Sequence, residues 1–502
     1  MGANVTRSSV LAFKEETTAG TLIVPVAADF VALREGFSVT NELETVTTDE
    51  LLGGIGQSAP INVGENPAAS WAGYLRHSET VGVAPEYGIV IESAMGSENA
   101  AAAEYNTVAG STTTVINVDS GEGASYQIGE ALLIQDSVNN FSLRNIESIS
   151  TDALTLNFTL GVTEPGVGIE LGRAILYRPE SSGHPTYSLH HYQNTTSAAL
   201  YQAIAGCRTT SLTLDFPTRD LAMITAEIEG LKYYFDGVTI DATNDDFTIT
   251  DDGGAVTGSL TQQTYQTPID LANAVATALS AASVGSGNDA ITCVYDSVTG
   301  KFTIATDGST LTLGCNVANS VFVEMGFGTL ELSGETTYTA ATALAVDPPA
   351  TPTYDGAEKV VVKHSELLIG DQADNTCRKA INTSFTVATP RTQVKSVCAV
   401  NGISETLTLS REATLSTTLV LEQYEAELMY KAINNTTTKI MFNTGPKSSA
   451  GNWTVNKCIN VYMKNAKIKA TVAEEEGYYT LAIEATGFIN SSTDKDIYIN
   501  FI

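Results

Sequence analysis

The side chains best suited to bind a metal ion or to move a proton are the adjacent histidines His190 and His191. Neighbouring residues on a β-strand point to opposite faces of the sheet, so this pair cannot hold one ion. The acidic stretch 241–246 and the pair 251–252 offer oxygen ligands for Ca²⁺, but their spacing fits no known calcium loop and lacks the terminal glutamate. We therefore expect structural histidines, solvated acidic turns and no metal site.

Thiols and glycine-rich loops also point away from catalysis. The six cysteines lie far apart, with no Cys-x-x-Cys pair and no histidine at ligand spacing; they are Cys207, Cys293, Cys315, Cys377, Cys398 and Cys458. We expect reduced, mostly buried thiols, with a disulfide between Cys293 and Cys315 as the alternative. The sequence has no Gly-x-Ser-x-Gly motif or Walker loop, and residues 53–56 lack the strand and helix of a dinucleotide loop. These patterns predict a protein that is not an enzyme and that uses no cofactor.

Charge is strongly acidic and unevenly distributed. The 502 residues carry 26 Lys and Arg against 57 Asp and Glu, a formal net charge of −31. Residues 233–352 hold 14 of the acids and the single base Lys301. A surface of this sign repels phosphate, which disfavours specific nucleic-acid binding. An acidic wall would let a polyanion slide past without sticking, but a need for solubility explains the charge equally well.

The elements that would carry these residues are mainly β-strands, and their order is written twice. Alternating apolar residues dominate, and the chain is too long for a single hydrophobic core. Each copy has a hairpin around a turn-rich stretch, then a helix, then a closing hairpin. The parts lie at 36–40, 69–75, 85–95 and 211–230 in the first copy and at 384–388, 414–421, 424–433 and 466–487 in the second. Repetition of a whole domain argues for assembly rather than for catalysis.

Details of the two copies agree. The alignment of the two copies makes Phe37 the equivalent of Phe385. The closing hairpins align if the second turn is one residue longer. Pro85 marks the expected start of the first helix, and Asn434 and Asn435 mark the end of the second.

Two unrelated segments interrupt the copies. Residues 108–180 predict a small barrel-like β module, with strand patterns at 113–118, 129–134, 141–149 and 154–158. Residues 233–347 combine strand patterns with one helix, which opens at Thr267 with Pro268 in its first position and Asp270 three residues after the cap. The linker 348–352 ends this segment. Both inserts are expected to project outward, where they would not obstruct assembly.

The first copy resembles the major tail tube proteins of long-tailed bacteriophages. The likeness lies in the opening 13–20 and 36–40, the loop with Pro60 and Gly64, the strand to Leu75, the helix after Ala84 and Pro85, and the closing stretches 184–192, 205–208 and 211–230. It covers most of residues 1–232 and, more weakly, 355–490. Some siphophage tube proteins are similar in that they too carry a duplicated domain.

The resemblance implies a mainly β fold with two tail-tube-like β-sandwich domains, each with one flanking helix, and with inserted small β and α+β modules. The first tube domain would have its N-terminal part at 1–107 and its closing strands at 181–232, around the small β insert 108–180. The acidic α+β insert 233–347, expected outside the tube, would separate it from a second tube domain at 348–502.

The same resemblance implies a structural subunit of a siphovirus tail tube, made in the cytoplasm of the host bacterium and located in the virion tail. Homotrimeric rings would stack into a hollow conduit for genome delivery and DNA ejection. The tape-measure protein and other tail proteins would be partners, and genomic DNA would pass through without specific binding. The sequence has no run of about 18 apolar residues that would span a membrane.

Two other classes of function remain open. A surface-exposed adhesive or decoration β-protein of a virion is the main alternative, although such a protein has no need for matching helices. A glycan-cleaving enzyme comes third, because carboxylates are plentiful but nothing in the sequence pairs them.

Two sets of residues are assigned to the tube on this basis. The stretch 49–65 is a predicted ring-stacking loop, because it exceeds a tight turn and yet carries apolar side chains; its candidate residues are Asp49, Leu51, Leu52, Ile55, Ile61 and Glu65. Acids of the closing hairpin are candidates to line a negative lumen that does not retain DNA, namely Asp215, Asp220, Glu227 and Glu229. Alternation would place Glu227 and Glu229 toward the lumen, with Ala226 and Ile228 behind them.

Overall fold

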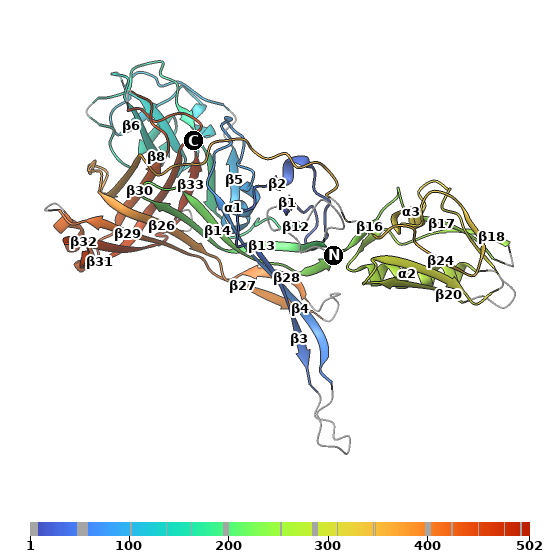
Figure 1. Ribbon diagram of the computed structural model, residues 1–502. Coiled ribbons are helices and arrows are strands. Elements are labelled where there is room, and N and C mark those ends of the chain that lie inside the picture. The colour runs from blue at the N-terminus through green and yellow to red at the C-terminus, as the bar shows by residue number, and fades with distance from the viewer. Residues whose placement is uncertain are drawn as a thin grey trace, which may run out of the picture.

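The protein is mainly β, as the computed structural model shows (Figure 1). It describes residues 9–502 except 48–58, 101–102, 137, 162, 194–199, 252–253, 284–289, 309, 345, 347, 397–402, 423–424, 450, 476 and 492–493. Strands hold 49% of the residues and helices 10%, which confirms the expected mainly β class. In the described ranges, no helix is long and apolar enough to cross a membrane.

Two copies of one arrangement form the body of the molecule. The first repeat consists of β1 (Val10–Glu15), η2 (Ala27–Asp29), β2 (Phe30–Val31), β3 (Ser38–Val46), β4 (Ile61–Tyr74), α1 (Gly88–Met95), β12 (Tyr187–Gln193), β13 (Leu200–Pro217), β14 (Met223–Glu229) and β15 (Lys232–Phe235). The second consists of β25 (Ser365–Gly370), β26 (Ala380–Ala388), β27 (Arg391–Lys395), β28 (Ile403–Thr408), β29 (Glu412–Val420), α4 (Ala426–Ile433), β30 (Thr438–Thr444), β31 (Ile459–Glu475), β32 (Tyr478–Gly487) and β33 (Tyr498–Phe501).

Each repeat is a sandwich of two sheets that share one long strand. In the first repeat, the outer sheet pairs β1 with β12, then β13, then β15, and the inner sheet runs β3-β4-β14-β13. In the second, the outer sheet joins β25, β30, β31 and β33, and the inner sheet runs β26-β29-β32-β31. The first halves of β13 and β31 thus lie in the outer sheets and their second halves in the inner ones.

A β-bulge at the same point of β13 and β31 fixes which residues are equivalent. In the first repeat, Tyr187 pairs with Cys207 and the register then shifts. In the second, Thr438 pairs with Ala466 and the register shifts in the same way. Bulges are specific features of a strand pair, so Cys207 and Ala466 occupy equivalent positions.

This register, carried across both inner sheets, makes Ser38 equivalent to Ser384. The sequence match of Phe37 with Phe385 is therefore wrong by two residues. The error leaves every side chain on its expected face, because a strand alternates with a period of two.

One hydrophobic core runs through both repeats, and α1 and α4 pack against it. Alternation in the inner strands feeds this core, as in β29, where Ala413, Leu415 and Leu419 are buried. Helix α1 begins at Gly88 rather than Pro85, because the Gly88 amide donates to the Pro85 carbonyl in a preceding turn. Helix α4 ends at Ile433, as predicted, and Asn435 follows in the left-handed region with φ 50°.

The first insert is a five-stranded sheet in the order β10-β7-β8-β9-β6. It contains β6 (Val115–Asn117), η3 (Glu122–Ser125), β7 (Ala131–Gln135), β8 (Phe141–Ser150), β9 (Ala153–Leu156) and β10 (Gly172–Arg173), which confirms the four predicted strands to within two residues at each end. Strands β5 (Gly96–Ala100) and β11 (Ile175–Pro179) frame it, and β11 also pairs with β33 of the second repeat.

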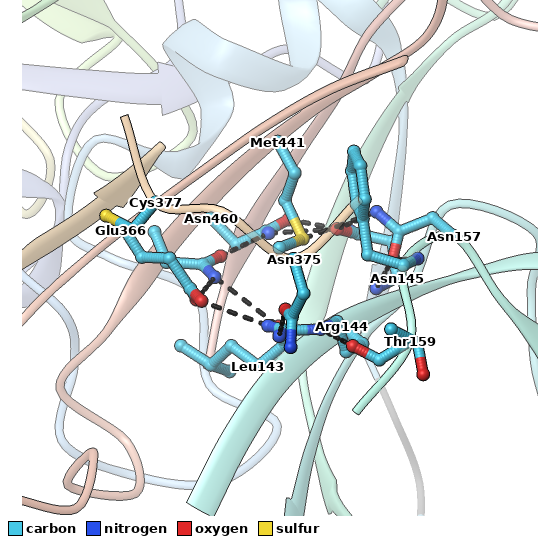
Figure 2. A network of polar contacts seen from close by, with 12 residues as sticks. Leu143, Arg144, Asn145, Asn157, Thr159, Glu366, Asn375, Cys377, Met441 and Asn460 are labelled. Atoms are coloured by element: carbon cyan, nitrogen blue, oxygen red, sulfur yellow. Dashed lines mark hydrogen bonds and ion pairs between the residues drawn. The ribbon is translucent and has the colours of Figure 1, made fainter. Parts of the chain in front are cut away.

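This insert does not project freely, as the sequence suggested, because a buried polar network anchors it to the second repeat (Figure 2). Asn145 Nδ2 donates to Asn460 Oδ1 at 2.7 Å, and Asn460 Nδ2 donates to Asn443 Oδ1 at 2.7 Å. Arg144 forms an ion pair with Glu366 at 3.2 Å. Removal of the insert would leave several buried groups without partners, so it is part of the folded body.

The second insert has its own hydrophobic core and extends away from the repeats (Figure 1). It contains β16 (Val238–Ile240), β17 (Asp246–Asp251), β18 (Gly254–Ser259), β19 (Gln263–Tyr265), α2 (Pro268–Ala282), β20 (Ile291–Asp296), β21 (Lys301–Thr306), β22 (Leu311–Leu313), α3 (Val321–Glu324), β23 (Leu332–Glu335) and β24 (Thr337–Thr339). Thr267 caps α2 by accepting from the Asp270 amide at 3.2 Å, which confirms the predicted start. Since β15 pairs with β13, the insert begins after Phe235 rather than at residue 233.

Candidate assembly interface

The inner sheets of the two repeats join into one eight-stranded sheet, in the order β3-β4-β14-β13-β26-β29-β32-β31. The joint between the repeats is the antiparallel pairing of β13 with β26, which spans residues 211–217 and 382–388. The Thr213 and Thr386 hydroxyls hydrogen-bond across it at 3.1 Å. On the core side, Leu214 lies opposite Phe385, and both are buried.

Helix α1 and the second repeat close this joint from the core side. The Thr209 hydroxyl donates to the Val90 carbonyl of α1 at 2.9 Å. Arg391 of the second repeat donates to the carbonyls of Ser93 at 2.9 Å and Thr209 at 3.1 Å. Burial, with a smaller contribution from Arg208, lowers the pKa of Arg391 to about 10, so this guanidinium is still charged at neutral pH.

The two outermost strands of the eight-stranded sheet each keep an unpaired edge within the described part of the chain. Strand β3 pairs only with β4, and residues 467–475 of β31 pair only with β32. Strand β3 is the equivalent of β26, and this half of β31 is the equivalent of β13. The two open edges are therefore equivalent to the two strands that meet in the internal joint. An open edge is a template for pairing with another chain.

The register of the internal joint can be transferred to these edges, and it sets complementary side chains opposite each other. One pair brings two hydroxyls together, as in the internal joint, a second brings two apolar side chains together, and a third brings opposite charges together. The pairs are Thr471 with Thr40, Val472 with Val39, and Lys469 with Glu42.

The stagger of the strands is that of a closed barrel. Ser38 and Ser211 lie in one row of paired residues across the first inner sheet. The next residue in this row is Ala388, whereas the equivalent of Ser38 in the second repeat is Ser384, four residues earlier in β26. Each four-stranded repeat is thus shifted by four residues against the next. A TIM barrel has the same ratio of about one residue per strand, with strands tilted by about 36°. Shear and strand number together determine barrel closure, so this sheet has the geometry to close when repeats are added.

Exposed apolar side chains gather near the open edge of β31. Val472 is 43% exposed, whereas its equivalent Leu214 is 1% exposed. Tyr430 and Ile433 of α4 are 66% and 74% exposed, although most of α1 is buried. Strand β26 of the second repeat covers the position of Leu214 in the first repeat. A strand paired in the same way with β31 would cover Val472.

The face of the inner sheet that points away from the core is polar. It carries three of the predicted lumen residues, Asp215, Glu227 and Glu229, each of which alternates with buried apolar neighbours. Asp220 lies in the turn between β13 and β14, so strand alternation does not place it on this face. The second repeat has Lys469 opposite Glu484 on the same face, so the acidic character belongs mainly to the first repeat.

The β3–β4 hairpin extends beyond the rest of the molecule (Figure 1). Leu43, Val46 and Ile61 on it are 56%, 50% and 56% exposed. Of the predicted stacking residues, Ile61 and Glu65 belong to strand β4, where Glu65 accepts from the Asn41 amide group at 3.1 Å. The other four, Asp49, Leu51, Leu52 and Ile55, lie outside the described residues.

The histidine pair is structural in its surroundings. His190 is buried; its Nε2 donates to the Ile23 carbonyl at 2.8 Å and its Nδ1 accepts from the Tyr201 hydroxyl at 2.7 Å. Burial lowers the pKa of His190 to about 4. His191 packs on the Phe37 ring with centroids 4.7 Å apart.

Neither metal ligands nor disulfides occur in the part of the chain that the structure describes. No group of three or more His, Cys, Asp or Glu side chains there could hold a metal ion. Cys207, Cys293, Cys315 and Cys458 are buried free thiols and Cys377 is an exposed one, so Cys293 and Cys315 are not joined. Cys398 lies outside the described residues.

No sequence pattern identified Glu16, a buried carboxylate at the turning point of β13. It accepts from the Gly206 amide at 2.7 Å, the Gly20 amide at 2.8 Å and the Ser188 hydroxyl at 2.9 Å. Burial raises the pKa of Glu16, and these hydrogen bonds act against the rise. Gly206 has φ 70° and marks the bend by which β13 passes from the outer to the inner sheet. Because Glu16 accepts from the Gly206 amide, it stabilises this bend. Gly206, a glycine inside a strand pattern, is the one signal that could have pointed to this bend.

Comparison of the sequence with protein-family models and with curated proteins finds no match.

Proposed function

We propose that the protein is a structural subunit of a phage tail tube, which polymerises as stacked rings into a hollow conduit for genome delivery. One observation carries the proposal: the two sides of the joint inside the chain recur as the two open edges of its sheet, with complementary residues in register. A chain built in this way adds to itself head to tail. Repetition of one joint by rotation gives a ring when the rotation closes, whereas a two-fold joint stops at a pair.

In this proposal, β31 of one copy pairs with β3 of the next, and trimeric rings surround the lumen with a continuous inner barrel. The polar face that carries Glu227 and Glu229 would then line the channel. The projecting β3–β4 hairpin would contact the next ring. The tape-measure protein and then genomic DNA would occupy the lumen, and the location would be the virion tail.

An adhesive or decoration protein is the second candidate, and the free-standing second insert is the feature that suits it, because an exposed module with its own core can bind a surface. This candidate leaves the complementary open edges without a role. The tail-tube proposal uses both features, since the insert can lie outside the ring.

Electron microscopy of the purified chain tests the proposal. Hollow rings and tubes are expected, and isolated particles or fibres would favour the adhesive alternative. Lys469→Glu should lower the yield of rings by mass photometry, because like charges would then meet at every joint. Glu42→Lys in the same chain should restore it, since the edges meet head to tail. Lys301→Glu, in the second insert, is the matched control. Unchanged ring yield in Lys469→Glu would contradict the assigned joint.

A further inference from the structure

A basic pocket lies at the end of the inner sheet that is opposite the β3–β4 hairpin. The segment 358–364 crosses between the repeats there and pairs with Arg76, just past the end of β4, and with Leu221 in the β13–β14 turn. It encloses a cavity of about 240 Å³ together with residues 445–447 of the second repeat. The lining residues are His77, Glu79, Glu358, Lys359, Val360, Val361, Lys363, His364, Gly445, Pro446, Lys447 and Lys457.

The lining combines apolar surface with positive charge, in a chain whose net charge is −31. Lys457 is 3.1 Å from Glu79 and 3.9 Å from Glu358, so one lysine neutralises part of the acidic side. Lys359 and Lys447 lie over the rings of Tyr74 and Trp453 instead. Among the described residues, neither of these two nor Lys363 forms an ion pair with a carboxylate. The pocket therefore offers positive charge beside the apolar groups of Val360, Val361 and Pro446.

The segment 48–58 has the complementary chemistry. It contains Asp49 and Glu50 and no basic residue, and it places Leu51 and Leu52 directly after the acids. An acidic pair followed by two leucines matches a pocket lined both by lysines and by the apolar groups of Val360, Val361 and Pro446.

The segment cannot reach the pocket of its own chain. The 14 residues of β4 span about 46 Å, at roughly 3.3 Å per residue, between the hairpin end at Ile61 and the pocket end at Tyr74. The connection between β3 and β4 runs from residue 47 to residue 60, so half of it extends at most about 25 Å. Contact must come from another copy. Rings that stack in one direction bring the hairpin end of one copy to the pocket end of the next.

We propose that this pocket is the receptor for residues 48–58 of a copy in the adjacent ring, with Lys359 and Lys363 facing Asp49 and Glu50. The inference rests on the proposed tube function and names the surface that stacks one ring on the next. It concerns the ends of the inner sheet, whereas ring closure concerns its lateral edges.

Charge reversal in the full-length chain separates these two contacts. Lys359→Glu/Lys363→Glu should leave the yield and mass of rings unchanged, because both side chains are exposed and neither belongs to β3 or β31, but should shorten tubes at least tenfold in electron micrographs. Asp49→Lys/Glu50→Lys in the same chain should restore long tubes. Lys301→Glu is the control for a change of charge elsewhere. Failure of the wild-type chain to form rings would defeat the proposed function itself.

Tubes of normal length from the lysine variant would overturn the pocket assignment, and so would a loss of tubes that the second charge reversal does not restore. A peptide of residues 46–60 gives a readout that does not depend on a variant. It should shorten wild-type tubes when added to disassembled protein, and the same peptide with Lys at positions 49 and 50 should not. An equal effect of inorganic phosphate at matched ionic strength would show a nonspecific anion effect and would also overturn the assignment.

Discussion

The two repeats have the same strands in the same order, but their edges differ. In the first repeat, β13 is paired with β26, and Leu214 in the joint is 1% exposed. In the second, the equivalent half of β31 is open, and Val472 is 43% exposed. The same position is thus core in one repeat and surface in the other. The difference indicates that Val472 lacks a partner strand. The chain provides such a strand, β26, only to the first repeat.

The same substitution at these two positions should therefore act on different processes, and this is the largest effect that we expect. Leu214→Asp places a carboxylate in the core, which should destabilise the chain by about 4 kcal/mol or more and prevent folding. Val472→Asp should leave the thermal unfolding of the isolated chain nearly unchanged and abolish rings. Circular dichroism with heating measures the first outcome, and mass photometry the second. If Val472→Asp unfolded the chain, the two positions would not differ in the way we infer.

The repeats also differ in what is attached to them, since only the first carries an insert that reaches across to the other repeat. Asn460 of the second repeat lies at the centre of that contact and bonds to Asn145, Asn443 and Asn500. Asn460→Ala should lower the free energy of unfolding by about 2–3 kcal/mol, because it leaves buried amides without partners. Chemical denaturation measures this loss. Asn273→Ala, at an exposed position of α2 in the second insert, is the control and should change stability by less than about 1 kcal/mol.

Features of the fold that depend on neighbouring residues could be predicted from the sequence, and features that depend on distant residues could not. Alternation and turn residues predicted the insert strands, and the sequence Thr267-Pro268 predicted the start of α2, because capping involves neighbours in the chain. The bond of Asn145 to Asn460 and the bonds of Glu16 to Gly206 and Ser188 join residues more than 150 positions apart, and single residues carry no mark of such partners. The joint between β13 and β26 was missed for the same reason. The repeat itself was visible in sequence only to within two residues, and the common bulge was needed to correct it.

Histidines provide a third contrast. Burial lowers the pKa of both His77 and His190, in the first repeat, to about 4, whereas His364 near the second is exposed. A histidine with a lower pKa in the folded state binds fewer protons there, so stability falls as pH drops from about 6.5 toward 4. Each of these two histidines should lower the free energy of unfolding by about 1 kcal/mol at pH 5.5. Burial raises the pKa of Glu16, so this carboxyl group makes the folded state more stable as the pH falls.

Hydrogen exchange locates this effect. Between pH 7.5 and pH 5.5, after correction for intrinsic rates, protection should fall in β12, which carries His190, and stay constant in its equivalent β30. Equal loss of protection in both strands would mean that acid acts on the whole chain and not through the buried histidines of the first repeat.

The smallest effect should come from the largest deletion, that of the second insert. Its two ends lie together, because Val238 and Val346 line the same cavity beside Tyr201 of the first repeat. Replacement of residues 238–344 by a short Gly/Ser linker keeps β15 and Val346 and removes a module with its own core. The unfolding free energy of the rest should change by no more than about 1 kcal/mol, from lost contacts such as the bond of Gln266 to Glu65. Rings should form with an unchanged lumen diameter in electron micrographs. A chain that no longer folds would place part of this module in the body of the tube domain, and rings of a different diameter would place it at the joint between chains rather than outside it.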